Sequence, residues 1–103
     1  MTKTEQIFTM ELLQRAIDTQ QLFGINMRNF TDKVNKFGAV AVAKEIIKKH
    51  SVSQSFNLLC DEGRLDLSME ELVTLSKFGE LFTDDEVNYC FELLCENDYY
   101  KLK

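Results

Sequence analysis

The sequence predicts an all-α protein, a compact single-domain bundle of about five to seven short helices spanning residues 1–103. Apolar residues recur at helical spacing, and Ser or Thr stands at three helix starts. Glycines stand where helices can end. The chain has no proline, and no stretch alternates apolar and polar residues long enough to predict a strand. The hydrophobic fraction of 45% is typical of a globular protein.

Helical periodicity divides the chain into elements. We expect helices over 4–22, 27–37, 39–49, 52–61, 69–75 and 84–96, with a further turn reaching 81 after the fifth. The clearest pattern is "EVNYCFELLC". Its apolar residues recur at i, i+3, i+4, i+7 and i+8, which predicts one buried face. They are Val87, Cys90, Phe91, Leu94 and Cys95.

Capping residues predict the helix ends. In a capping box, a Ser or Thr side chain caps the helix and a glutamate three residues later bonds back to it. The three candidate pairs are Thr2 with Glu5, Ser68 with Glu71, and Thr83 with Glu86. A glycine that ends a helix adopts a left-handed conformation that other residues disfavour. The candidates for this role are Gly24, Gly38, Gly63 and Gly79.

One set of apolar side chains should form the core, because these residues share the predicted inner faces of the helices and of the "RLDL" link. The predicted core residues are Phe30, Val34, Phe56, Leu59, Leu65, Leu72, Leu81, Val87, Phe91 and Leu94. In this interpretation "DEGRLDLSMEEL" is a corner between two helices. Gly63 ends one helix, Asp66 faces outward, Ser68 starts the next helix, and Arg64 is placed to bridge Asp61, Asp66 or Glu70.

Charge is divided unevenly along the chain. Residues 1–50 carry eight Lys/Arg and five Asp/Glu, a net charge of +3, whereas residues 51–103 carry four and twelve, a net charge of −8. Acids also end two predicted helices, where they oppose the helix dipole. We therefore expect these acids to form, in part, one solvent-facing negative surface, which is either a docking surface for another protein or only a solvated face. Its candidate residues are Asp61, Glu62, Arg64, Asp66, Glu70, Glu96 and Asp98.

No constellation predicts an enzyme, a metal site or a cofactor. If Gly63 takes the glycine position of an EF-hand loop, then Leu58, Cys60 and Met69 fall where oxygen ligands belong. The single histidine, His50, ends a basic helix, and no glycine-rich phosphate loop is present. The prediction is therefore a non-enzymatic protein with no catalytic residues, no metal ligands and no cofactor.

Nucleic-acid binding through the basic N-terminal half is the alternative. "VAKEIIKKHSVSQSF" loosely follows a helix-turn-helix, although the turn glycine is missing and the turn is too long. Lysine and arginine side chains there would contact phosphates. The candidates are Arg28, Lys33, Lys36, Lys44, Lys48 and Lys49.

The N-terminal segment, the apolar runs and the cysteines indicate the cellular setting. The N-terminus is too polar for a signal peptide or an anchor, and the longest apolar run, "AVAVA", is too short to span a bilayer. Three cysteines without a CxxC pair are expected as reduced thiols in the core. We therefore expect a cytoplasmic protein without membrane contact. Its oligomeric state stays open, and a homo-oligomer is one outcome.

Three segments together resemble a small, uncharacterised bacterial helical module. They are "FGAVAVAKEII", "SQSFNLLCDEGRLDLSMEELV" and "FGELFTDDEVNYCFELL", with the specific part in the pattern GRLDLSxE followed by LFTxxE. The resemblance covers about residues 24–98. Similar segments occur as small stand-alone proteins and beside restriction-type or nuclease domains, so the resemblance implies an accessory role in a bacterial, phage or mobile-element setting. It transfers no active site to this chain. Members often carry Trp where this chain has Leu59 or Cys60.

The function expected from these observations is a non-enzymatic protein-interaction module. One version is a small accessory or inhibitor protein that acts on a nucleic-acid-processing or defence enzyme, with acids imitating phosphates. The partner is another protein of unknown identity.

Overall fold

The computed structural model describes residues 2–100 and confirms the all-α prediction. No strand forms within that range. The helices, in order, are α1 (Lys3–Phe23), α2 (Arg28–Phe37), α3 (Ala39–Lys48), α4 (Phe56–Asp61), the 3₁₀ helix η1 (Leu65–Leu67), α5 (Met69–Thr74), the 3₁₀ helix η2 (Ser76–Leu81) and α6 (Asp84–Glu96).

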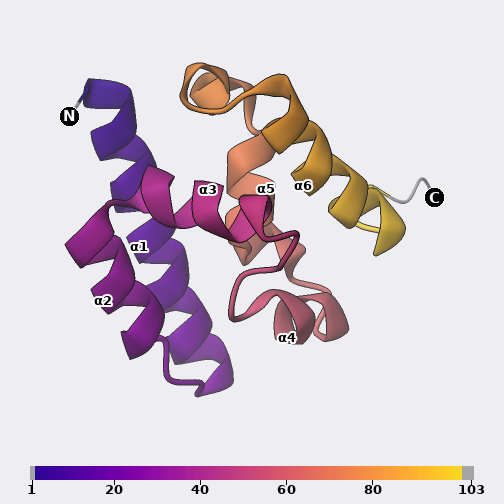
Figure 1. Cartoon of the computed structure of the whole chain (residues 1–103). Helices are drawn as coiled ribbons and strands as arrows, with labels where there is room; N and C mark the ends of the chain where they lie inside the picture. The colour runs from indigo at the N-terminus through magenta and orange to yellow at the C-terminus, as the bar shows by residue number, and fades with distance from the viewer. Residues whose placement is uncertain (1, 101–103) are drawn as a thin grey trace.

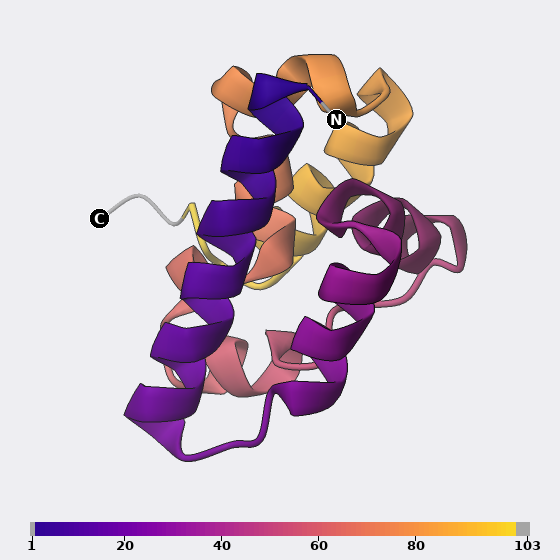
Figure 2. The same ribbon diagram turned by 90° about the vertical axis from the view of Figure 1, so that its left-hand side faces the viewer.

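The longest helix, α1, forms one side of the molecule and contacts both halves of the chain (Figures 1 and 2). α2 and α3 pack against α1 and against each other, and α5, η1 and η2 also contact α1. α6 packs chiefly on α5 and also reaches α3. The chain therefore folds as one helical globule in which α1 joins the basic first half to the acidic second half. Within residues 2–100, no helix has the length and apolar character needed to cross a membrane.

Two of the three predicted capping boxes are complete. The Thr2 and Thr83 hydroxyls accept from the backbone N–H groups of Glu5 and Glu86, and each glutamate bonds back to its cap. Ser68 caps α5 by accepting from the Glu71 N–H. The Glu71 carboxylate does not complete that box, because Oε1 lies 2.8 Å from Arg15 Nη1 in an ion pair.

The predicted glycine stops are correct at three positions. Gly24, Gly38 and Gly63 all have positive φ, and Gly38 joins α2 directly to α3. Gly79 was wrongly expected to end a helix, since it lies inside η2. Its neighbour Phe78 is 1% exposed, so the segment stays helical because it packs an aromatic ring into the core.

Two apolar clusters make up the interior. The larger is built from α1, α2, α3, α5, η2 and α6 around Phe8, Leu12, Leu72 and Phe78. The smaller consists of Phe56, Leu59, Leu65 and Leu94, so it joins α4 and η1 to α6. Each cluster stabilises the fold because its apolar side chains are removed from water. Residues of α1 lie at the centre of the larger cluster.

Most of the predicted core is confirmed. Seven predicted residues are buried, and they are Phe30, Val34, Phe56, Leu59, Leu65, Leu72 and Leu94. Leu81 and Val87 are partly buried against the larger cluster. The prediction that Phe91 is buried was wrong, because 47% of its surface is exposed. α6 buries the stripe through Cys90 and Leu94, so Phe91 points outward and stacks on Tyr100 with ring centroids 5.1 Å apart.

Candidate protein-docking groove

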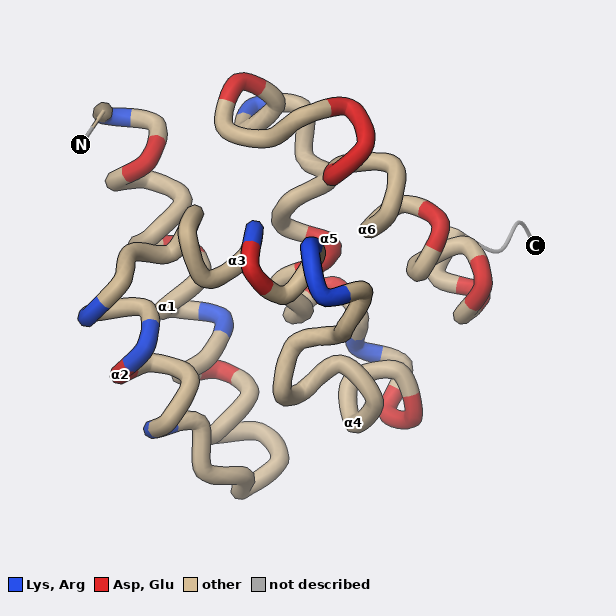
Figure 3. Tube along the Cα trace, viewed as in Figure 1, with Lys and Arg blue, Asp and Glu red and all other residues tan. Residues whose placement is uncertain are grey.

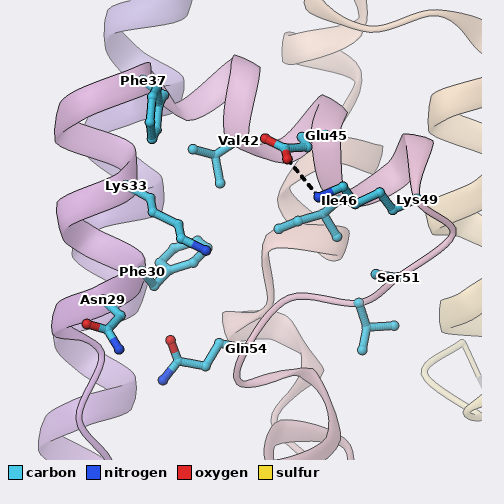
Figure 4. Close-up of a pocket in the computed structure, with 11 residues that line it drawn as sticks. Asn29, Phe30, Lys33, Phe37, Val42, Glu45, Ile46, Lys49, Ser51 and Gln54 are labelled. Atoms are coloured by element: carbon cyan, nitrogen blue, oxygen red, sulfur yellow. Dashed lines mark ion pairs between the residues drawn. The ribbon is translucent and has the colours of Figure 1, made fainter.

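α2 and α3 diverge from Gly38, and the space between them is an open groove of about 400 Å³ (Figure 4). The connection from Lys49 to Gln54 closes its far end. Apolar side chains from all three segments contribute to the lining, which consists of Asn29, Phe30, Lys33, Phe37, Val42, Glu45, Ile46, Lys49, Ser51, Val52 and Gln54. The groove therefore combines an apolar floor with charged and polar edges, the composition of sites that bind a side chain or a small molecule.

Phe37 is the most exposed aromatic side chain of the groove, with 60% of its surface accessible. It is the last residue of α2, beside Gly38, and also lines a second hollow that reaches Ala39 and Val40. Figure 4 shows it at the end of the groove opposite Asn29 and Gln54. A large exposed ring between two hollows is a common feature of interaction sites, because its burial on binding is favourable.

The connection that closes the groove is held by bonds to three other parts of the fold. Tyr89 on α6 donates its hydroxyl to the Ser51 carbonyl (2.8 Å), and Gln54 Nε2 donates to the Asn26 carbonyl (2.9 Å). His50 takes the left-handed conformation (φ 54°) that lets the chain turn away from α3. The end wall is consequently formed before any partner arrives.

The third attachment is a buried carboxylate. Ser53 donates its backbone N–H to Glu70 Oε2 (2.6 Å) and its hydroxyl to Glu70 Oε1 (2.7 Å). Glu70 is 0% exposed and Ser53 is 4% exposed. Burial raises the pKa of Glu70, while the two bonds from Ser53 oppose that rise. Glu70 was wrongly expected on a solvent-facing acidic surface, because its carboxylate points inward and holds the groove's connecting segment.

The part of the chain that carries the groove is predominantly basic. Residues 25–54 carry six Lys/Arg and two Asp/Glu, a net charge of +4, while the rest of the chain has a net charge of −9. Figure 3 shows this division between α2–α3 and the C-terminal half. Within the groove, Lys49 Nζ lies 2.9 Å from Glu45 Oε1 and holds the pKa of Glu45 below its usual range. Lys33 points from α2 into the space between the helices (Figure 4) and makes no ion pair within residues 2–100.

The structure separates the six basic residues of the nucleic-acid alternative. Lys33 and Lys49 line the groove, and Lys36 lies over the Phe37 ring, with Nζ 5.3 Å from its centroid. Lys44 instead binds Glu86 at the start of α6 (2.7 Å). Arg28 lies at the other end of α2, 3.9 Å from Asp32, and Lys48 is exposed at the end of α3.

A helix-turn-helix does not form at the predicted place. The chain between Lys48 and Phe56 is longer than the three- or four-residue turn of that motif. α4 has only six residues and buries Phe56 and Leu59 in the smaller core. No recognition helix is therefore presented by this segment.

The C-terminal ends of α4 and α6, which both carry acidic residues, are in contact. Cys60 donates its thiol to Asn97 Oδ1 (3.3 Å), which brings the two C-terminal ends together. We call the exposed acids of these ends the acidic joint, which consists of Asp61, Glu62, Glu96 and Asp98.

Arg64 binds both carboxylate oxygens of Asp66 and holds the pKa of Asp66 below its usual range. No group of three metal-ligating side chains occurs in the described part of the chain.

Sequence reasoning located some of the groove's lysines but not the groove. It missed Phe37, which stands seven residues after Phe30 and three after Val34 and so has the spacing of a buried residue. The available sign was its place directly before Gly38, where the helix ends and cannot cover it. No family model, curated protein or solved structure matches the chain. The resemblance carried by "GRLDLSMEEL" therefore stays a prediction.

Proposed function

We propose that this chain is a non-enzymatic protein-interaction module and that a segment of its partner docks in the groove between α2 and α3. The observation that carries the proposal is the groove itself, with an apolar floor and an exposed Phe37 at its end. Its volume of about 400 Å³ suits a few side chains of a partner segment. Helix-lined apolar grooves commonly bind such segments.

The fixed end wall supports this proposal. Bonds from Tyr89, Glu70 and Gln54 hold the connection in place before binding. A preformed site loses less conformational entropy on association, so a small groove can still bind a partner measurably. The acidic joint is the competing docking surface on this chain.

Nucleic-acid binding is less well supported by the same surface. Phosphate contacts need cations that are free and aligned. Lys44 is engaged by Glu86, and Glu45 introduces a negative charge between the groove lysines. The apolar floor matches the side chains of a protein segment better than it matches a phosphate backbone.

Capture of partners from cell extract tests the proposal with two matched variants. Phe37→Ala removes the exposed ring of the groove, and Phe91→Ala removes an equally large exposed ring from α6. We expect proteins that bind the wild type and Phe91→Ala but are lost with Phe37→Ala. Retention by Phe37→Ala, together with loss after Asp61→Asn, Glu62→Gln and Glu96→Gln, would place docking at the acidic joint.

A further inference from the structure

We infer that the groove between α2 and α3 selects an acidic peptide segment whose apolar side chains are flanked by Asp or Glu. This inference rests on the proposed docking function and adds the chemistry of the partner. Its basis is the placement of charge around the apolar floor. Lys33 stands on the α2 wall and Lys49 at the end of α3, so cations border the floor on both sides (Figure 4).

The cations of the groove are incompletely neutralised within the protein. Lys49 has Glu45 as its partner, whereas Lys33 forms no ion pair among residues 2–100. Lys36 and Lys48, which do not line the groove, form none there either. Glu45 is therefore the one acid among the groove-lining residues, against two lysines. A partner segment with carboxylates on both sides of its apolar residues would complement this arrangement, and a basic segment would be repelled.

The apolar floor defines the rest of the partner. Val42, Ile46 and Val52 line the groove together with Phe30, and Phe37 stands at its end. Apolar side chains of a bound segment would cover these groups and bury part of the exposed Phe37 ring. Charge then selects among segments that carry suitable apolar residues, and it mainly speeds their encounter with the groove.

The distribution of charge over the molecule favours an acidic occupant of the groove over a basic one. The rest of the chain has a net charge of −9, so a basic partner would be drawn to that acidic part of the surface instead. An acidic partner is repelled from most of the surface and attracted to α2–α3. Electrostatics therefore directs an acidic segment to the one region where the apolar groove is found.

Selection from a random peptide library tests the inference. The library is selected on the wild type, on Phe37→Ala, and on the double variant Lys33→Glu and Lys49→Glu. We expect peptides enriched on the wild type to combine apolar residues with an excess of Asp and Glu. The double variant should reverse that charge preference, and Phe37→Ala should abolish enrichment. Lys77→Glu, a charge reversal on η2 away from the groove, is the control and should keep the wild-type preference.

The outcomes separate the two claims. Peptides that depend on Phe37 but show no acidic excess would overturn the partner chemistry and leave the docking function standing. Enrichment that is equal on the wild type and Phe37→Ala would overturn both. An enriched acidic peptide should also lose about tenfold in affinity between low and moderate salt, because the attraction is screened. Displacement of that peptide by duplex DNA in a Lys33-dependent way would favour the nucleic-acid alternative instead.

Discussion

Replacing Glu70 with glutamine tests how the groove wall is built. In the wild type both carboxylate oxygens accept bonds from Ser53, and the side chain is fully buried. Glutamine has nearly the same shape. Its carbonyl oxygen can still accept from the Ser53 N–H, and its amide can donate to the Ser53 hydroxyl oxygen. The substitution therefore keeps the contact and removes the buried charge.

Two opposing contributions set the magnitude. Bonds to a charged acceptor are worth about 1.5–3 kcal/mol each and neutral bonds about 0.5–1.5 kcal/mol, so glutamine loses about 2–3 kcal/mol over two bonds. Removal of a carboxylate from water costs several kcal/mol. The pKa of Glu70 is raised, and desolvation is the largest cause. The cost of burying the charge is therefore larger than the gain from its two hydrogen bonds, and removing the charge should be favourable. We expect the glutamine variant to be more stable than the wild type well above the folded-state pKa of Glu70.

The sign of the pH dependence follows from the raised pKa. The folded protein holds the Glu70 proton more tightly than the unfolded chain, so this residue contributes most stability below its unfolded pKa. That contribution is lost as pH rises through the folded pKa, by about 1.4 kcal/mol per pH unit between the two values. The wild type and the glutamine variant should therefore have similar stability below the unfolded-state pKa of Glu70 and should differ most above its folded-state pKa.

Urea unfolding followed by far-ultraviolet circular dichroism, repeated across acidic to mildly basic pH, measures the difference. Glu92→Gln, on the exposed surface in the middle of α6, controls for removal of one acidic side chain from the surface. Ser53→Ala should cost about 1–3 kcal/mol, because it leaves Glu70 with one donor. A glutamine variant that is less stable by the same amount at every pH would refute the description of Glu70 as a buried, desolvated carboxylate.

Three further predictions concern the core, the thiols and the helix ends. Leu94→Ala should lower the unfolding free energy by about 2–5 kcal/mol in urea titration, because Leu94 is 0% exposed in the smaller core, and a loss under about 1 kcal/mol would contradict that placement. A maleimide should label Cys95 in the folded protein. Cys90 should react only after unfolding, because burial raises its pKa to about 12, and rapid native labelling of Cys90 would contradict the packing. Glu62→Gln and Glu96→Gln should each stabilise the fold by about 0.3–1 kcal/mol at low salt by removing charges that oppose helix dipoles, and a loss in thermal unfolding would count against this.

The sequence was informative wherever local chemistry determines the structure. Thr2 and Thr83 cap helices because their hydroxyls meet nearby N–H groups, an interaction contained within four residues. Gly63 ends α4 because its φ of 69° disfavours other residues. The small core was also predictable, since Leu59 and Leu94 follow similar apolar patterns on their helices.

The predictions that failed concern residues whose surroundings are set by parts of the chain distant in sequence. Cys90 and Phe91 are adjacent on α6, and the packing of α6 on α5 and α3 buries Cys90 but leaves Phe91 exposed. Glu70 has the position of an exposed acid in a first helical turn, but Ser53, distant in sequence, satisfies its carboxylate inside the protein. The groove likewise arises from how α2 and α3 diverge, which no local pattern specifies.

Mapping backbone amide shifts in ¹H–¹⁵N spectra while adding a peptide enriched on the wild type tests docking in the groove most directly. We predict that the perturbed residues cluster on α2, α3 and the connection 49–54, with Phe37 among the largest shifts. The same peptide should leave α4 and the end of α6 unchanged. Shifts centred on the acidic joint, with Phe37 unaffected, would contradict docking between α2 and α3.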